Sequence, residues 1–267
     1  MQNILNLHEA TTPKYPQIFT NLVYAFKDGQ ALTLNLIVPP VRPGTKPHFP
    51  LLIYVPDIAD DNSVKRDERL SQMFSFARYG YAVALLSYRS KSDVSLMVKD
   101  INSAVRFLLS KTYKYHFDPY RYVLFGEGLG AYLSALCLLK QRDQALHDED
   151  IHRSPLRYQC CLMLSAPDFF VPLPASYKRY QKTAPTLLEV LQKVSGKLPP
   201  VLLLNGTKEP FLPPKEATML LNAFINAQSN AQLYNFTDAP RGSDAFFTPY
   251  SIDLMVDFID NSLKKKG

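Results

Sequence analysis

Three glycines, Gly126, Gly128 and Gly130, follow a short apolar run and precede an apolar pattern with helical spacing. Residues 121–139 therefore predict a strand, a sharp turn and a helix. In a G-x-S-x-G turn of this kind the outer glycines prevent side-chain clashes, and the middle serine is held at the tip for nucleophilic attack. The middle residue here is Gly128, so the turn is predicted without its nucleophile.

A G-x-G-x-x-G dinucleotide-binding turn is the obvious alternative for a glycine triplet after a strand. It requires the third glycine three residues after the second, whereas Gly130 follows Gly128 by two. The spacing therefore disfavours a nucleotide site.

The segments that must position this turn alternate between strand and helix patterns. Runs 22–26 and 31–38 flank Lys27-Asp28-Gly29-Gln30, and the Asp-Gly pair predicts a tight antiparallel hairpin. Further strands are predicted over 51–55, 81–86, 122–125, 158–165, 200–205 and 231–236, and further helices over 66–79, 94–109, 214–227 and 252–263. This alternation predicts an α/β protein with a doubly wound, mostly parallel sheet.

Segment 166–199 is too long for a plain connection in a compact domain, so we expect a lid or cap over the edge of the sheet. No change of composition divides the rest of the chain, and residues 1–267 are predicted to form a single domain.

Composition and charge exclude several classes of function. The net charge of +6 is dispersed, with one basic run at 264–266, so no nucleic-acid surface is expected. Cys137, Cys160 and Cys161 lie in apolar patterns and are expected to be buried reduced thiols, with no metal site. The N-terminus lacks a secretory pattern and no long apolar run occurs, which favours a soluble cytoplasmic protein without a membrane partner.

Four short motifs carry a resemblance to a known family. They are Tyr88-Arg89, Phe117-Asp118-Pro119-Tyr120-Arg121, Gly126-x-Gly128-x-Gly130 and Gly206-Thr207-Lys208-Glu209-Pro210. With the predicted elements, they resemble the α/β-hydrolase family, in particular its carboxylesterase and acetyl-esterase branch related to hormone-sensitive lipase. The resemblance covers nearly the whole chain and implies the α/β-hydrolase fold with no cofactor.

The resemblance also assigns positions to the parts of acyl transfer. The nucleophile position is Gly128, the acid position is Glu209, and the histidine position is Arg241 or Asp244. The oxyanion loop corresponds to Pro56-Asp57-Ile58, where an aspartate would oppose a developing negative charge. All five histidines precede residue 153.

Other side chains could in principle replace the missing nucleophile. Glu127 flanks the turn and is expected to point away from its tip. Ser134 is expected to pack within the helix, Ser165 to end a strand, and Ser243 to lack an activating histidine.

The sequence therefore predicts a non-catalytic pseudo-esterase, with no catalytic residues and vestigial positions Gly128, Glu209 and Arg241, the last two expected to form a charged pair. Glu127, Gly128, Leu129 and Arg241 are predicted to line a pocket for a small ligand, because a helix N-terminus and an arginine attract anions. A homo-oligomer or a subunit of an active paralogue is a further hypothesis. The alternative is a carboxylesterase that acts through non-standard residues.

Overall fold

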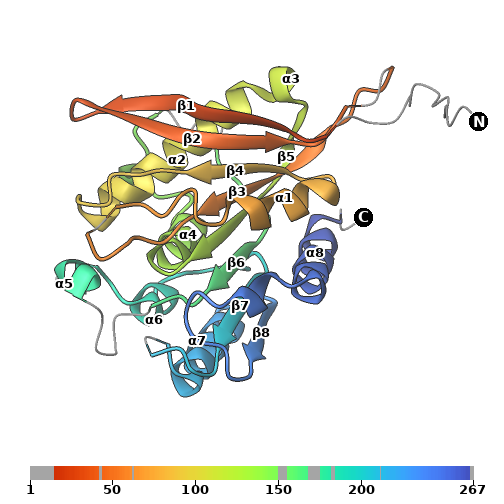
Figure 1. The fold of residues 1–267 in the computed structure, drawn as a ribbon. Helices are drawn as coiled ribbons and strands as arrows, with labels where there is room; N and C mark the ends of the chain where they lie inside the picture. The colour runs from red at the N-terminus through yellow and green to blue at the C-terminus, as the bar shows by residue number, and fades with distance from the viewer. Residues whose placement is uncertain are drawn as a thin grey trace, which may run out of the picture.

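The computed structural model describes residues 15–41, 44–61, 63–149, 155–167, 175–181, 184–210 and 212–264. These residues form one eight-stranded sheet in the order β1-β2-β4-β3-β5-β6-β7-β8, with helices on both faces (Figure 1). The strands are β1 (Gln17–Lys27), β2 (Gln30–Val38), β3 (Phe49–Val55), β4 (Ala82–Leu86), β5 (Phe117–Glu127), β6 (Cys161–Leu164), β7 (Val201–Gly206) and β8 (Ala231–Phe236). The prediction of an α/β fold with a mostly parallel sheet is confirmed.

The N-terminal hairpin joins the parallel part of the sheet through one antiparallel pairing. β1 pairs with β2 and β2 with β4 in antiparallel fashion, and every later pairing is parallel. Asp28 and Gly29 both have positive φ, as the predicted Asp-Gly turn requires.

Two apolar layers cover the central strands, because these strands carry apolar side chains on both faces. One layer contains side chains of α2 (Val94–Ser110), α4 (Leu129–Leu139) and α7 (Pro214–Asn226). The other contains side chains of α1 (Leu70–Arg78) and α8 (Pro249–Leu263). The remaining helical segments are α3 (Thr112–Tyr115), η1 (Gln144–Leu146) and η2 (Asp244–Phe247).

Several predicted boundaries differ from the structure, such as the starts of β1 at Gln17 and β6 at Cys161, and three of the differences have local reasons. α1 begins at Leu70, not at residue 66, because Arg66 and Asp67 bond to side chains of the hairpin instead. β5 begins at Phe117, before Asp118-Pro119, since a register shift opposite Phe49 accommodates these residues. α8 begins with Pro249 in its first turn, capped by the Thr248 hydroxyl.

The 166–199 segment contributes α5 (Ala175–Gln181) and α6 (Leu187–Leu191) to the structure. Part of the predicted lid, residues 168–174 and 182–183, lies outside the described residues. α6 begins with a capping box between Thr186 and Glu189 and packs against α4 and α7. None of the helices in the described ranges is long and apolar enough to span a membrane.

Candidate active site

The turn between β5 and α4 is as sharp as the glycine spacing predicts. Gly128 has φ 56° and ψ −124°, a conformation that glycine adopts without strain. A side chain at Gly126 would overlap the backbone of Ala131, and one at Gly130 would overlap the carbonyl oxygen of Val55. Close backbone packing therefore requires both outer glycines, whereas the middle position points outward from the turn.

The carboxylate of Asp57 fills the space directly over Gly128. A methyl group added to Gly128 would overlap the carboxyl carbon of Asp57 and Nη2 of Arg241. Asp57 follows β3 and is buried, and it reaches this position because β3 and β5 are neighbours in the sheet. The glycine thus makes room for a carboxylate supplied by another strand.

Three groups hold the Asp57 carboxylate in place. The backbone N–H of Leu129, at the start of α4, donates to Oδ1 over 2.9 Å, and Nη2 of Arg241 donates to Oδ2 over 2.5 Å. The Tyr177 hydroxyl, from α5, donates a short hydrogen bond to Oδ1. These donors satisfy the carboxylate with a helix N-terminus, a cation and a phenol.

Tyr177 is the residue of this site that sequence reasoning missed. It lies 120 positions from Asp57, and its hydroxyl also accepts from Leu129 N–H at 2.9 Å and from Arg241. Burial, followed by the charge of Asp57, raises the pKa of Tyr177 well above its usual value, so it stays a phenol. The sequence places Tyr177 only within the 166–199 segment, which is predicted to be a lid or cap.

Arg241, and not Asp244, lies beside the predicted acid position. Its Nη1 is 3.7 Å from Oε1 of the buried Glu209. Burial alone would lower the pKa of Arg241, but Tyr177 and Asp57 raise it above its usual value, so the guanidinium stays charged. Asp244 is exposed and pairs with Arg69 at 3.5 Å.

Glu127 does not join the predicted ligand pocket with Arg241. Its carboxylate accepts from the Tyr54 hydroxyl at 2.6 Å and is held by Arg69 through Nη2 at 2.9 Å and Nε at 3.1 Å. Arg69 also donates to the carbonyl of Gly242 at 3.0 Å and stacks on Phe247. Arg69 therefore fastens the turn to the loop that carries Arg241.

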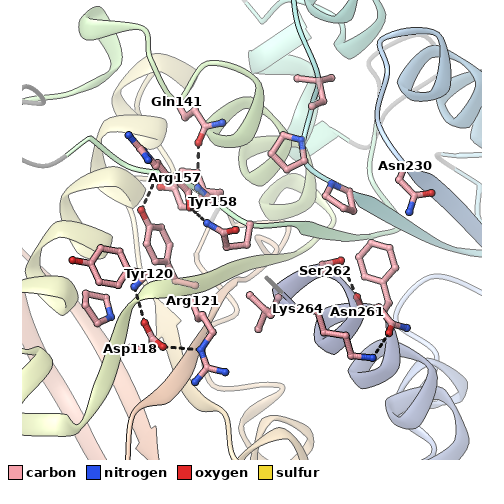
Figure 2. A pocket seen from close by; sticks show the side chains of 18 of the residues that line it. Asp118, Tyr120, Arg121, Gln141, Arg157, Tyr158, Asn230, Asn261, Ser262 and Lys264 are labelled. Atoms are coloured by element: carbon pink, nitrogen blue, oxygen red, sulfur yellow. Dashed lines mark hydrogen bonds and ion pairs between the residues drawn. The ribbon is translucent and has the colours of Figure 1, made fainter. Parts of the chain in front are cut away.

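A large hollow lies away from this site, at the amino ends of the parallel strands (Figure 2). Figure 2 shows Asp118 and Arg121 at the start of β5, and Arg157 and Tyr158 just before β6. The Gly128 turn follows the carboxyl end of β5, so the hollow and the turn lie at opposite ends of this strand.

A protein-family model described as BD-FAE matches residues 40–224, which include the Gly128 turn, Asp57 and Glu209. The chain belongs to the BD-FAE family. Its sheet order and elbow are those of the α/β-hydrolase fold.

Solved structures agree with this BD-FAE assignment at the level of the fold. Esterase 2 of Thermogutta terrifontis superposes with a TM-score of 0.75 at 19% identity, covering 92% of this chain and 94% of that chain. A form of the same esterase phosphorylated by paraoxon has a TM-score of 0.75 at 18% identity, with coverage of 94% and 96%. A truncated carbohydrate esterase from gut microbiota has a TM-score of 0.76 at 17% identity, with coverage of 94% and 98%.

Among curated proteins, the isoprenylcysteine alpha-carbonyl methylesterase ICME of Arabidopsis thaliana is 24% identical over 82% of this BD-FAE chain and 56% of its own length. The probable methylesterase ICMEL2 of the same plant is 23% identical over 75% of this chain and 52% of its own length. The chain spans about half the length of these relatives.

These findings contradict the prediction of a pseudo-esterase, because the similar structures are named as esterases and the curated relatives as methylesterases. The prediction relied on residue types at the expected positions. It did not anticipate that a carboxylate from the β3 loop would stand over Gly128. The findings support the alternative, a hydrolase that acts through other residues.

Proposed function

We propose that this BD-FAE protein hydrolyses carboxylic esters with the Asp57 carboxylate as general base. The observation that carries the proposal is the place of this carboxylate, which fills the space above Gly128. The substrate class is supported by the names of the similar esterases and methylesterases.

In the proposed reaction Asp57 takes a proton from water while the oxygen of that water attacks the ester carbonyl carbon. The carbonyl oxygen becomes an oxyanion and is stabilised by the guanidinium of Arg241. When the tetrahedral intermediate collapses, the bond to the alcohol oxygen breaks, and protonated Asp57 returns its proton to the leaving alkoxide. The products are a carboxylic acid and an alcohol, and no covalent acyl-enzyme forms.

The surrounding side chains have positioning roles in this proposal. Tyr177 and Leu129 N–H fix the orientation of the Asp57 carboxylate, and Glu209 holds Nη1 of Arg241. Arg69 keeps the Arg241 loop against the turn through Gly242 and Glu127. Preorganised charges of this kind avoid reorganisation during the reaction.

Hydrolysis of 4-nitrophenyl acetate by the purified protein tests the proposal. We expect Asp57→Asn to lower kcat by about 10²–10⁴-fold, the usual contribution of a general base. Asp60→Asn, an exposed carboxylate on the same loop, is the matched control and should keep the wild-type rate. Absence of hydrolysis by the wild type, or an Asp57→Asn variant as active as Asp60→Asn, would overturn the proposal.

Two further measurements separate this route from a covalent one. In Asp57→Gly, added formate should restore part of the activity, because a small carboxylate can occupy the place between Leu129 N–H, Tyr177 and Arg241. Paraoxon should leave the protein unmodified by mass spectrometry, since position 128 carries no hydroxyl. Stoichiometric phosphorylation would show that a side chain acts as nucleophile.

A cytoplasmic location belongs to the same proposal. Cys137, Cys160 and Cys161 are buried free thiols, which is usual for proteins of a reducing compartment. Fractionation of the source cells, with recovery of the protein outside the cytoplasm, would contradict it.

A further inference from the structure

Two fully buried polar side chains, Ser165 and Asn205, lie near the carboxyl ends of β6 and β7, the strands that follow β5 in the sheet. Ser165 is 1% exposed and Asn205 is 0% exposed. Within the described part of the chain, neither the Ser165 hydroxyl nor either polar atom of the Asn205 amide makes a hydrogen bond. Native proteins leave few buried polar groups unsatisfied, so each such group calls for an explanation.

The backbone places Ser165 next to the elbow and next to the strand that carries Asn205. Ser165 N–H donates to the carbonyl of Leu204 over 3.0 Å, and Gly128 N–H donates to the carbonyl of Leu164 over 2.9 Å. Ser165 therefore lies between Gly128 and Asn205, at the carboxyl ends of three neighbouring strands. Such an edge is where ligands bind in open α/β sheets.

Ser165 also has an unusual backbone conformation. Its φ is 50°, in the left-handed region that residues other than glycine seldom adopt. Strain of this kind tends to persist at ligand-binding positions. The strain and the two unsatisfied groups thus occur at one place.

Side chains of α4, α6 and α7 cover one face of the sheet in the described part of the chain. The alternation of β7 puts Asn205 on the same face as Leu203, which packs in the layer that contains α4 and α7. α6 packs against both of these helices, and Tyr132 on α4 donates to the carbonyl of Pro185 just before α6.

We propose that Ser165 and Asn205 form a subsite for a hydroxyl group on the acyl part of the ester, so that esters of hydroxy acids are preferred. A hydroxyl both donates and accepts, as do a serine hydroxyl and an asparagine amide together. A site with such groups disfavours an analogue that lacks the hydroxyl, because its own polar atoms then stay unpaired. This inference rests on the proposed ester hydrolysis.

A matched pair of substrates tests it: 4-nitrophenyl 3-hydroxybutyrate and 4-nitrophenyl butyrate. We expect the wild type to prefer the hydroxy ester in kcat/KM by about tenfold or more. Ser165→Ala and Asn205→Leu should bring the ratio close to one by losing activity on the hydroxy ester. Ser134→Ala is the control, because Ser134 lies within α4 and is another buried hydroxyl that makes no hydrogen bond among the residues that the structure describes.

A binding measurement keeps the two proposals distinguishable. The neutral amides 3-hydroxybutyramide and butyramide are compared by the rise in melting temperature that they cause. If the wild type hydrolyses neither ester but is stabilised more by the hydroxy amide, and Ser165→Ala removes the difference, the subsite stands and the proposed hydrolysis fails.

A wild-type kcat/KM ratio near one for the two esters would overturn the subsite, and so would variants that keep the wild-type ratio. If the protein hydrolyses neither ester, equal stabilisation by the two amides would overturn it. Asn205→Leu could also alter folding, so the melting temperature of this variant is measured. If the two variants give different substrate ratios, the result of Ser165→Ala, the smaller change, is decisive.

Discussion

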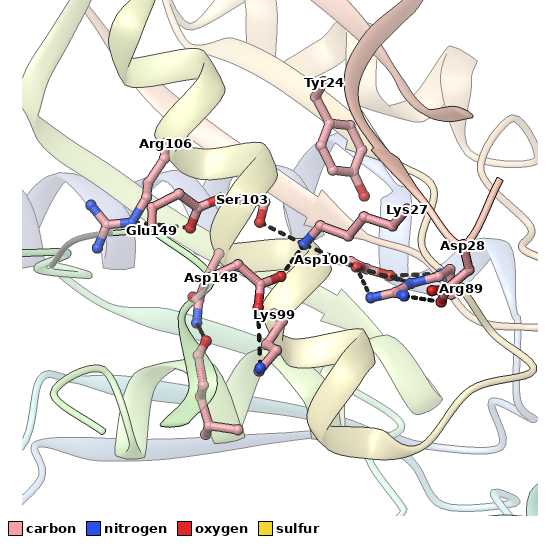
Figure 3. A network of polar contacts seen from close by, with 12 residues as sticks. Tyr24, Lys27, Asp28, Arg89, Lys99, Asp100, Ser103, Arg106, Asp148 and Glu149 are labelled. Atoms are coloured by element: carbon pink, nitrogen blue, oxygen red, sulfur yellow. Dashed lines mark hydrogen bonds and ion pairs between the residues drawn. The ribbon is translucent and has the colours of Figure 1, made fainter. Parts of the chain in front are cut away.

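Two clusters of buried charge in this molecule differ in how completely their members are satisfied. One fastens the N-terminal hairpin to α2 (Figure 3). There Asp100, with no exposure, accepts from the backbone N–H of Arg89 at 3.0 Å, from its Nη2 at 2.7 Å and from its Nε at 2.9 Å. Lys27 donates to Ser103 at 2.8 Å and to Asp148 at 2.5 Å.

The second cluster surrounds Asp57 over the Gly128 turn. Its carboxylate is as well held as that of Asp100. The turn beneath it bonds through Gly128 N–H to Leu164, the residue before Ser165, and the side chains of Ser165 and Asn205 make no hydrogen bond in the described residues. Buried groups that are paired, such as Asp100 and Arg89, add rigidity, whereas buried polar groups without a partner keep capacity for a ligand. The first cluster then has a structural role, and the proposed function gives the second a chemical one.

Breaking the structural cluster should have the largest effect on stability. Asp100→Ala leaves Arg89 buried without its main partner, and we expect a loss of about 3–5 kcal/mol in the free energy of unfolding, measured with urea. Asp148→Ala is the control, since its side chain is 37% exposed and surface pairs contribute about 0–1 kcal/mol. Losses of equal size would contradict the comparison.

Placing a serine in the functional cluster should come next. Gly128→Ser introduces a side chain into the space of the Asp57 carboxylate, so we expect about 1–3 kcal/mol of destabilisation and no gain in hydrolysis.

The reason can be isolated by a double variant. Asp57→Gly combined with Gly128→Ser should recover part of the lost stability, because the overlap disappears. Additive losses in the double variant would show that Asp57 is not what excludes the serine.

The sequence allowed the turn to be predicted because the glycine spacing and the flanking apolar patterns lie in one short stretch of chain. Gly126 is required by contact with Ala131 in the same strand-turn-helix, whereas the contact of Gly130 with Val55 reaches the neighbouring strand β3. The α/β fold class also follows from the alternation of apolar strands and amphipathic helices. Such features depend on neighbouring residues along the chain.

The contents of the site could not be predicted in the same way. The sequence placed Asp57 on the loop after a strand, but no pattern shows that its carboxylate reaches over Gly128. The contact with Tyr177 joins residues 120 positions apart. Unsatisfied groups such as Asn205 become visible only when every neighbour has a position. The site therefore depends on contacts between segments that are distant in the sequence.

A smaller change separates the two roles of α5. Tyr177→Phe removes a hydroxyl that donates to Asp57. Tyr180 lies on the same helix, and Tyr180→Phe removes a hydroxyl that donates to the carbonyl of Ser90. Each should cost about 0.5–1.5 kcal/mol in unfolding free energy. Only Tyr177→Phe should lower kcat, with KM nearly unchanged, and a similar fall in Tyr180→Phe would assign both residues to packing alone.

The smallest expected effect is a dependence of stability on pH that arises beside the structural cluster. His147 is buried next to Asp148, with Nε2 at 3.1 Å from the carbonyl oxygen of Gln141 and Nδ1 at 3.4 Å from Nη2 of Arg106. Burial, and secondarily the charge of Arg106, lowers the pKa of His147 below its ordinary value of 6.5. The unfolded chain then binds more protons than the folded one between the two pKa values, so this contribution to stability is complete above pH 6.5 and is lost as the pH falls through the folded pKa.

Urea unfolding at a series of pH values from 7.5 to 5 should show a decline in the free energy of unfolding. The decline should be shallower in His147→Gln, by less than one proton in slope. Identical slopes in the two proteins would mean that His147 has the same pKa in both states, and the decline would then belong to other groups.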